Sequence, residues 1–318
     1  MKTFDEIYNE LQNDNNINEL NNEWKKTQEK NKKNKKIAVT VILIIDLLIL
    51  LILFAYGSMQ LATSIMPVIL VLNIVAGGII LASLTLSKEY IEFVGKYKDF
   101  ITKKIISNFY DNLEYFPEKE MPEYIYREAR YEHYDNYSSN DYLEAQIDNK
   151  YSIQMADVSA EEIREYEDQN GEKREEKITV FSGIFAKIII DKSINAELRI
   201  MQDKKLKFDK NRLNMDSSEF EKYFDVKSSD PVIAMQILTA DVMEELVEFE
   251  NKTNMKYDIY IKDNEIYLRF HLGALNVNVW NLKNSVLDPK VTQKSFYMLN
   301  FTYNLSKKLI NILNDIQL

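Results

Sequence analysis

Residues 257–272 read YDIYIKDNEIYLRFHL, and this stretch decides the fold class. Apolar and polar side chains alternate over 257–261 and again over 265–272, which is the two-residue period of a strand with one buried face. The polar residues 262–264 separate the two runs. The pattern therefore predicts a β-hairpin and, with it, an antiparallel sheet.

Strand and helix signals come in clusters along the rest of residues 88–318. Short apolar runs predict strands at 178–181, 184–190, 196–201 and 276–280, with a turn at 191–195. Apolar residues at helical spacing predict helices at 88–116, after the capping residue Thr239, and from about Pro289 to Ile316. Residues 161–177 are strongly charged and are expected to form an exposed hairpin tip or an insertion. Because like elements cluster, we predict an α+β domain with an antiparallel sheet and packed helices.

A long apolar block precedes this domain. Residues 37–86 carry a single ionisable side chain, that of Asp46. Twenty helical residues span about 30 Å, the thickness of the bilayer hydrocarbon, so residues 37–56 and 61–86 are each long enough to cross it. Only residues 57–60 connect the two spans. The sequence therefore predicts an antiparallel two-helix transmembrane hairpin over residues 37–87.

The residues that flank the apolar block set its predicted orientation. Residues 24–36 contain seven lysines. Five more lysines follow the block: Lys88, Lys96, Lys98, Lys103 and Lys104. The positive-inside rule then places both ends of the chain in the cytoplasm. We predict a multi-pass membrane protein in contact with the lipid bilayer, with a cytoplasmic helical arm over 1–36 and a cytoplasmic α+β domain over 88–318.

Two polar residues, Asp46 and Asn73, fall inside the predicted spans. At 1.5 Å per helical residue they lie at similar depth, within about a turn of each other. One interpretation is a hydrogen bond that locks the hairpin or an oligomer. The other interpretation is a site for an ion or a proton, since charged groups are costly in hydrocarbon and are often functional there.

The composition excludes several classes of site. The chain has 7 Gly, and Gly77 and Gly78 lie in the apolar block, so no glycine-rich loop is present to wrap a phosphate. It has 0 Cys, which removes disulfides and thiol chemistry. The sequence pI near 5.0 argues against nucleic acid as a partner. We predict no cofactor.

The residues suited to catalysis are few and scattered. The two histidines, His133 and His271, are not accompanied by the partners that a catalytic triad or a metal site needs. The carboxylates of Glu219, Glu221, Asp225 and Asp230 cluster in one segment and are typical of a solvated helix start, with a divalent-cation site as the alternative. We therefore assign no catalytic, cofactor-binding or metal-binding residue.

The order of several short motifs resembles a known family. These motifs are Asp141-Tyr142-Leu143-Glu144, Phe181-Ser182-Gly183-Ile184-Phe185, Glu219-Phe220, Phe224-x-Val226-x-x-x-Asp230, Ala234, Ile237-Leu238-Thr239 and Met243. Their spacing over about residues 100–275 is similar to that of the bacterial domain of unknown function 3137 family (DUF3137), labelled "galanin-like" in automated naming. The resemblance implies a bacterial membrane protein, and it brings no established activity or site.

The resemblance singles out residues whose expected role is to shape the domain. Phe181, Gly183 and Phe185 are expected to do so at a strand junction. Four more are expected in the helices and turns that follow: Phe220, Phe224, Asp230 and Thr239.

Taken together, the sequence predicts a membrane-anchored cytoplasmic binding or scaffold module that is not an enzyme. Its partner would be another protein or a second copy of the chain. One alternative is an enzyme that acts on a membrane-adjacent substrate through carboxylates such as Glu219 or Asp230. Another is a small transport or channel subunit that uses Asp46.

Overall fold

The structure is a computed structural model of the whole chain. It describes residues 1–55, 71, 73, 75, 77, 78, 88–168, 171–202, 212–271 and 285–315. The chain divides into two compact units. One comprises Met1–Ile7, Thr102–Asn281 and Pro289–Leu318, and the other comprises Tyr8–Ile101 and Leu282–Asp288.

The smaller unit is helical. After α1 (Phe4–Gln12), which begins in the larger unit, it contains α2 (Asn15–Ala55) and α4 (Lys88–Tyr97). These two helices pack through Trp24, whose ring stacks on that of Phe93 with centroids 4.8 Å apart. Both side chains are buried, so the apolar stripe that begins in the N-terminal segment is the core of this unit.

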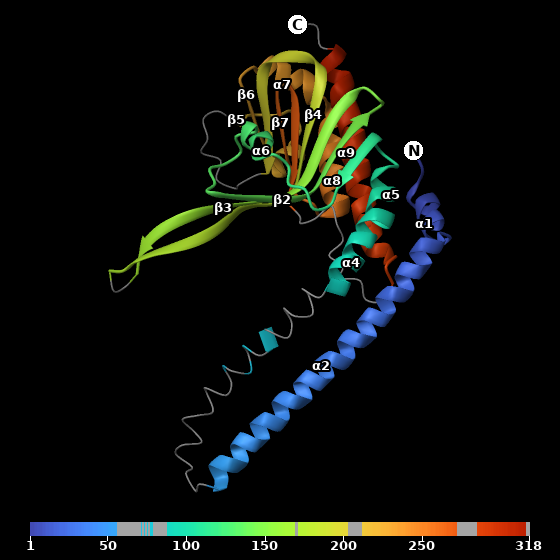
Figure 1. Cartoon of the computed structure of the whole chain (residues 1–318). Helices are drawn as coiled ribbons and strands as arrows, with labels where there is room; N and C mark the ends of the chain where they lie inside the picture. Colours follow the sequence, from blue (N-terminus) through green and yellow to red (C-terminus); the bar gives the residue numbers. More distant parts are fainter. Residues whose placement is uncertain are drawn as a thin grey trace. The chain divides into compact units, whose positions relative to one another are not determined.

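The larger unit is built on a seven-stranded antiparallel sheet (Figure 1). Its strands are β1 (Asp111–Phe116), β2 (Asn136–Ile147), β3 (Tyr151–Glu167), β4 (Lys173–Gln202), β5 (Arg212–Leu213), β6 (Phe224–Ser228) and β7 (Tyr257–Phe270). The strand order is β1-β2-β3-β4-β6-β5, and β7 also pairs with β4. The α+β class with an antiparallel sheet is therefore confirmed.

The helices of this unit are short except for the last two. In chain order its helical elements are α5 (Lys103–Ile106), α6 (Glu123–Glu128), the 3-10 helix η2 (Phe220–Lys222), α7 (Pro231–Ile237), α8 (Ala240–Thr253) and α9 (Pro289–Asp315). The π-helix η1 (Lys98–Thr102), which precedes them, belongs mostly to the smaller unit. Helices α8 and α9 lie on one face of the sheet, and α6 lies on the other (Figure 1).

The residues of β7 alternate between these two faces. Tyr257 and Phe270 contact Phe301 of α9, with ring centroids 5.2 and 6.2 Å away. Tyr260 and Tyr267 instead join the buried cluster that contains Tyr126 of α6. Both faces of β7 are buried, which explains why its sequence is so rich in aromatic and β-branched residues.

The hairpin predicted over 257–272 is wrong, because 257–270 form a single strand. The register with β4 runs from Ile200↔Ile259 to Ile184↔Phe270 and shifts at Ile194↔Asp263. The two segments predicted as turns, 191–195 and 262–264, thus face each other as irregularities in one ladder. Asp263 has φ 52°, a left-handed conformation that Asp tolerates and that also occurs in turns.

The helix predicted over 88–116 ends earlier than expected. Helical structure stops at Ile106, and residues 111–116 form β1, in which Tyr115 pairs with Leu143. The buried hydroxyl of Tyr115 donates to Asp141 Oδ1 at 2.5 Å, a sheet contact that no local periodicity reveals. The strand predicted at 276–280 lies outside the described residues. The predicted final helix agrees with α9.

Within the charged stretch 161–177, residues 161–167 of β3 and 173–177 of β4 belong to a two-stranded ribbon (Figure 1). β2 stops pairing with β3 at Glu161, and β7 stops pairing with β4 at Ile184. From Glu165 to Glu167 and from Lys173 to Glu175 the side chains are exposed. The predicted exposed hairpin therefore agrees with the structure.

The predicted transmembrane hairpin over 37–87 is corrected. In the ranges that the structure describes, no helix is long and apolar enough to cross a membrane. Residues 37–55 are the C-terminal part of α2, which begins at Asn15 with a polar first half. The second predicted span, 61–86, lies almost wholly outside the described residues.

The predicted localisation is corrected on the same finding. A multi-pass protein of the bacterial inner membrane with both termini in the cytoplasm needs two spanning helices, and none is found among the described residues. The domain boundaries predicted at residues 36 and 87 stay predictions.

Replacement of Asp230 by Ala should destabilise the larger unit by about 1 kcal/mol, because its side chain is the N-cap of α7. Asp230 Oδ1 accepts hydrogen bonds from the amides of Val232 at 2.9 Å and Ile233 at 3.3 Å. The free energy of unfolding in urea measures the loss. Glu219→Ala is the matched control, because Glu219 is exposed and pairs with Lys222 one turn away, a surface ion pair that contributes little. Equal effects of the two changes would contradict the capping role.

Candidate functional site

The aromatic residues singled out by the motifs lie in the cores of the fold. Phe181 and Phe185 of β4 are buried against Tyr126, with ring centroids 5.9 and 5.0 Å away. Gly183, between them, pairs with Val158 of β3. This group is one aromatic cluster on the α6 face of the sheet.

The second group of motif residues lies elsewhere. Phe220 and Phe224 are buried with ring centroids 5.0 Å apart, and Phe224 also contacts Tyr257 at 5.3 Å. Asp230 caps α7, and Thr239 occupies the N-cap of α8, where its hydroxyl donates to Asp241 at 2.5 Å. The two groups do not converge on a common site, and their importance to function stays a prediction.

The polar pair of the apolar block is in contact. The Asn73 amide donates to Asp46 Oδ2 at 2.9 Å, and both side chains are half-buried. Whether this contact has a structural or a functional role stays a prediction.

His271 belongs to a buried network of charges on the α6 face. The side chain of Asp258 is 2 % exposed. Its Oδ2 accepts a hydrogen bond from Arg269 Nε at 2.5 Å and lies 2.7 Å from His271 Nε2. Arg269 also pairs with Glu132, which in turn accepts the hydroxyl of Tyr126. Each carboxylate of the network therefore has a charged or hydroxyl partner, as burial of charge requires.

Aromatic rings enclose this network. The Arg269 guanidinium lies over the rings of Tyr131 at 4.0 Å and Phe181 at 5.3 Å. Burial opposes ionisation of Asp258, but the hydrogen bond from His271 and the charges of Arg269 and His271 outweigh it, so the pKa of Asp258 is lowered from 3.8. The network has the properties of a satisfied structural ion cluster that ties β7 to the 126–134 segment.

A surface hollow of about 430 Å³ lies at the same segment, lined by Tyr126, Arg127, Arg130, Tyr131, Glu132, His133 and Tyr134. The second histidine, His133, is thus at the surface. Arg127 is engaged by Glu123, and Glu132 by Arg269. The hollow is formed by one continuous segment, the end of α6 and the residues that follow it, and no group of three or more potential metal ligands occurs among the described residues.

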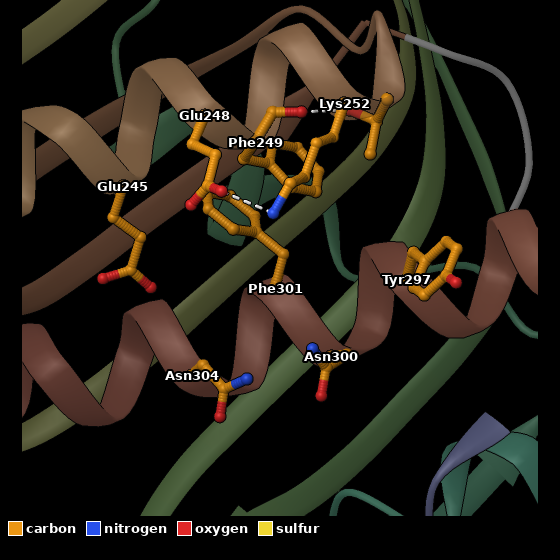
Figure 2. A pocket seen from close by; sticks show the side chains of 9 residues that line it. Glu245, Glu248, Phe249, Lys252, Tyr297, Asn300, Phe301 and Asn304 are labelled. Atoms are coloured by element: carbon orange, nitrogen blue, oxygen red, sulfur yellow. Dashed lines mark hydrogen bonds and ion pairs between the residues drawn. The ribbon is translucent and has the colours of Figure 1, made fainter.

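The larger cleft of the two lies between α8 and α9 and has a volume of about 530 Å³. Its lining residues come from one stripe of each helix, at the helical spacing of three and four residues. From α8 these are Glu245, Glu248, Phe249, Lys252 and Thr253, and from α9 they are Tyr297, Asn300, Phe301 and Asn304 (Figure 2).

The floor of this cleft is aromatic. Phe249 and Phe301 point toward each other between the helices (Figure 2), and their rings stack with centroids 3.5 Å apart and planes 11° apart. Both rings rest on Tyr257 of β7, which lies 5.5 Å from Phe249 and 5.2 Å from Phe301. The cleft is therefore held by the sheet and is preformed.

The charges at the rim of the cleft are compensated within the domain. Glu248 pairs with Lys252 at 2.5 Å, and Glu245 pairs with Lys308 at 2.8 Å. The side chains of Asn300 and Asn304 behave differently, since neither has a hydrogen-bond partner in the described parts of the chain. They lie one turn apart along α9 (Figure 2). The unsatisfied hydrogen-bonding groups of the cleft are therefore neutral amides.

Sequence reasoning predicted a helix after Thr239 and a final helix from about Pro289 but missed the cleft. Asn300 and Asn304 carried a readable signal, because two amides at i and i+4 share one face of a helix. The pairing of α8 with α9, which makes that face the edge of a cleft, has no local signature.

The fold defines the larger unit as an α+β domain with helices on an antiparallel sheet. Residues 179–310 match the family described as "Protein of unknown function (DUF3137)". The family resemblance is thus confirmed, over a range that starts later and ends later than the motifs suggested. This range includes β7, α8 and the cleft-lining part of α9.

Other comparisons add little. The chain matches no curated protein. It is similar to a crystal structure of the mycobacterial trehalose monomycolate transport factor A, TtfA, with 10% sequence identity and a TM-score of 0.36, over 65% of this chain and 93% of that chain. At that TM-score the similarity supports no argument about function.

Replacement of Asp258 by Asn should cost about 3 kcal/mol of stability at neutral pH, because it leaves buried Arg269 short of a counter-charge. The pKa of Asp258 is lowered in the folded chain, so the stability it contributes is present above pH 3.8 and is lost as the pH falls through its folded pKa. Urea unfolding from about pH 6 to pH 3 measures this.

The wild-type free energy of unfolding should fall more steeply with acid than that of Asp258→Asn. Parallel curves for the two proteins would show that Asp258 is not held ionised by the network. Asp263→Asn, at an exposed position on the same strand, is the matched control for loss of a carboxylate.

Proposed function

We propose that the larger unit is a binding module that holds a segment of a protein partner in the cleft between α8 and α9. The observation that supports the proposal is the combination of a preformed aromatic floor with side-chain amides at its edge that have no hydrogen-bond partner among the described residues. Concave sites with an apolar lining and a few placed polar groups are the usual form of a ligand site.

The energetics of the cleft favour occupation. An unpaired amide in the unliganded domain is hydrated, and each hydrogen bond that replaces water contributes about 0.5 to 1.5 kcal/mol. Tyr297 is 45% exposed beside the cleft and supplies further aromatic area. Tyrosine at such a position is well suited to binding, because its rigid ring offers contact area at low entropic cost.

The carboxylates named as alternative catalytic groups have other roles. Glu219 is exposed and pairs with Lys222, and Asp230 is engaged by the amides of α7. Neither lines the cleft or the 430 Å³ hollow. The binding role therefore draws on different residues from those the sequence suggested.

A photo-reactive phenylalanine analogue in place of Tyr297 should crosslink to the partner in cells that express the full chain. The crosslinked segment is then made as a synthetic peptide, and its Kd is measured by fluorescence anisotropy. The double variant Asn300→Ala/Asn304→Ala should weaken this binding about 5- to 100-fold, since two hydrogen bonds are lost.

Asn311→Ala is the matched control, because Asn311 is exposed on the same helix but does not line the cleft. It should leave Kd unchanged, and the melting temperatures of all three proteins should agree. Crosslinking at Tyr297 that yields only peptides whose affinity is unaffected by the double variant would refute the proposal.

A further inference from the structure

We infer that the cleft recognises the main chain of an extended peptide, an inference that rests on the proposed function. Asn300 and Asn304 would form hydrogen bonds to two peptide residues that are separated by one intervening residue. The ligand class is thus a β-like segment of a partner protein, and its recognition is through backbone groups. The geometry of the two amides is the basis of this assignment.

The spacing of the amides matches the repeat of an extended chain. Four residues along α9 correspond to a rise of about 6 Å. One edge of an extended peptide presents the N–H and C=O of every second residue, which repeat at about 6.6 to 6.8 Å. Each asparagine amide has two donors and one acceptor oxygen, so it can bond both groups of one peptide residue.

The electrostatics of the cleft also favour main-chain recognition. Its carboxylates are already paired: Glu248 forms an ion pair with Lys252, and Glu245 forms one with Lys308. The groups without partners among the described residues are the neutral amide dipoles of Asn300 and Asn304. A neutral peptide group complements a neutral amide, whereas a charged ligand would have to compete with the existing ion pairs.

The aromatic floor adds a preference for side chains. Successive side chains of an extended peptide point to opposite sides, so alternate residues face Phe249 and Phe301. Both rings are nearly buried, at 8% and 6% exposure, and can be covered further only by apolar atoms. We expect an apolar residue at the position between the two that bond the asparagines.

A helical ligand fits this cleft less well. Its peptide groups are already bonded within the helix, so they leave Asn300 and Asn304 without partners. Docking it would dehydrate both amides without replacement, which is unfavourable. An extended segment has free backbone groups along its edge and satisfies both side chains.

The experiment uses the full chain and a random peptide display library as the probe. Peptides are selected against the wild type and counter-selected against Asn300→Ala/Asn304→Ala. The best binder is then remade with a single backbone ester or N-methyl group at each position in turn. The substitution should weaken binding about tenfold at each of two positions that are separated by one residue, and it should have little effect at the other positions.

A double-mutant cycle assigns each peptide group to its asparagine. With the Asn300→Ala protein, backbone substitution at one of the two peptide positions should no longer weaken binding. With the Asn304→Ala protein, the same should hold for the other position. Asn311→Ala should leave both sensitive. Unchanged melting temperatures of the variants exclude loss of folding.

The failures are distinguishable. A peptide that needs Asn300 and Asn304 but shows no backbone-sensitive pair would overturn main-chain recognition and leave the binding module standing. A library that yields no peptide dependent on the two asparagines would overturn both.

Discussion

The pairing of β4 with three other strands is the constraint on which the rest of the domain depends. β4 runs from Lys173 to Gln202 and is bonded to β3, β6 and β7. Its side chains and those of β7 alternate between two covered faces, so the sheet builds an ion network under α6 and an aromatic support for α8 and α9 at once. The register shift opposite Asp263 changes the phase of this alternation, because Tyr257 and Phe270 are an odd number of residues apart and yet both contact Phe301 of α9.

Local periodicity predicted much of this architecture and failed where a signal has two structural meanings. The alternating runs 257–261 and 265–272 correctly indicated buried strand faces. The polar segments 191–195 and 262–264 were interpreted as chain reversals, yet they lie opposite each other as irregularities within the β4–β7 ladder. Turns and bulges both favour short polar residues and left-handed conformations, so only the long-range pairing separates them.

Part of the candidate site could likewise be predicted from local sequence, and part depends on long-range pairing. Arg269 and His271 are two residues apart in one predicted strand, so their shared face is readable from the alternation. Asp258 lies in the other predicted strand, and its place beside them needs the observed register. Glu132, which completes the network, is distant in sequence and could not have been placed. The cleft needs the pairing of α8 with α9 and the stacking of Phe249 on Phe301, and neither leaves a mark in the sequence of one helix.

The support of the cleft by β7 links occupancy to the integrity of the fold. The Phe249–Phe301 stack rests on Tyr257, and Tyr257 belongs to a strand that is bonded to β4. Unfolding of the sheet therefore abolishes the cleft, and a ligand that binds only the folded form protects the sheet by mass action. At a ligand concentration one hundred times Kd this protection amounts to about 2.7 kcal/mol, a substantial share of the stability of an ordinary domain.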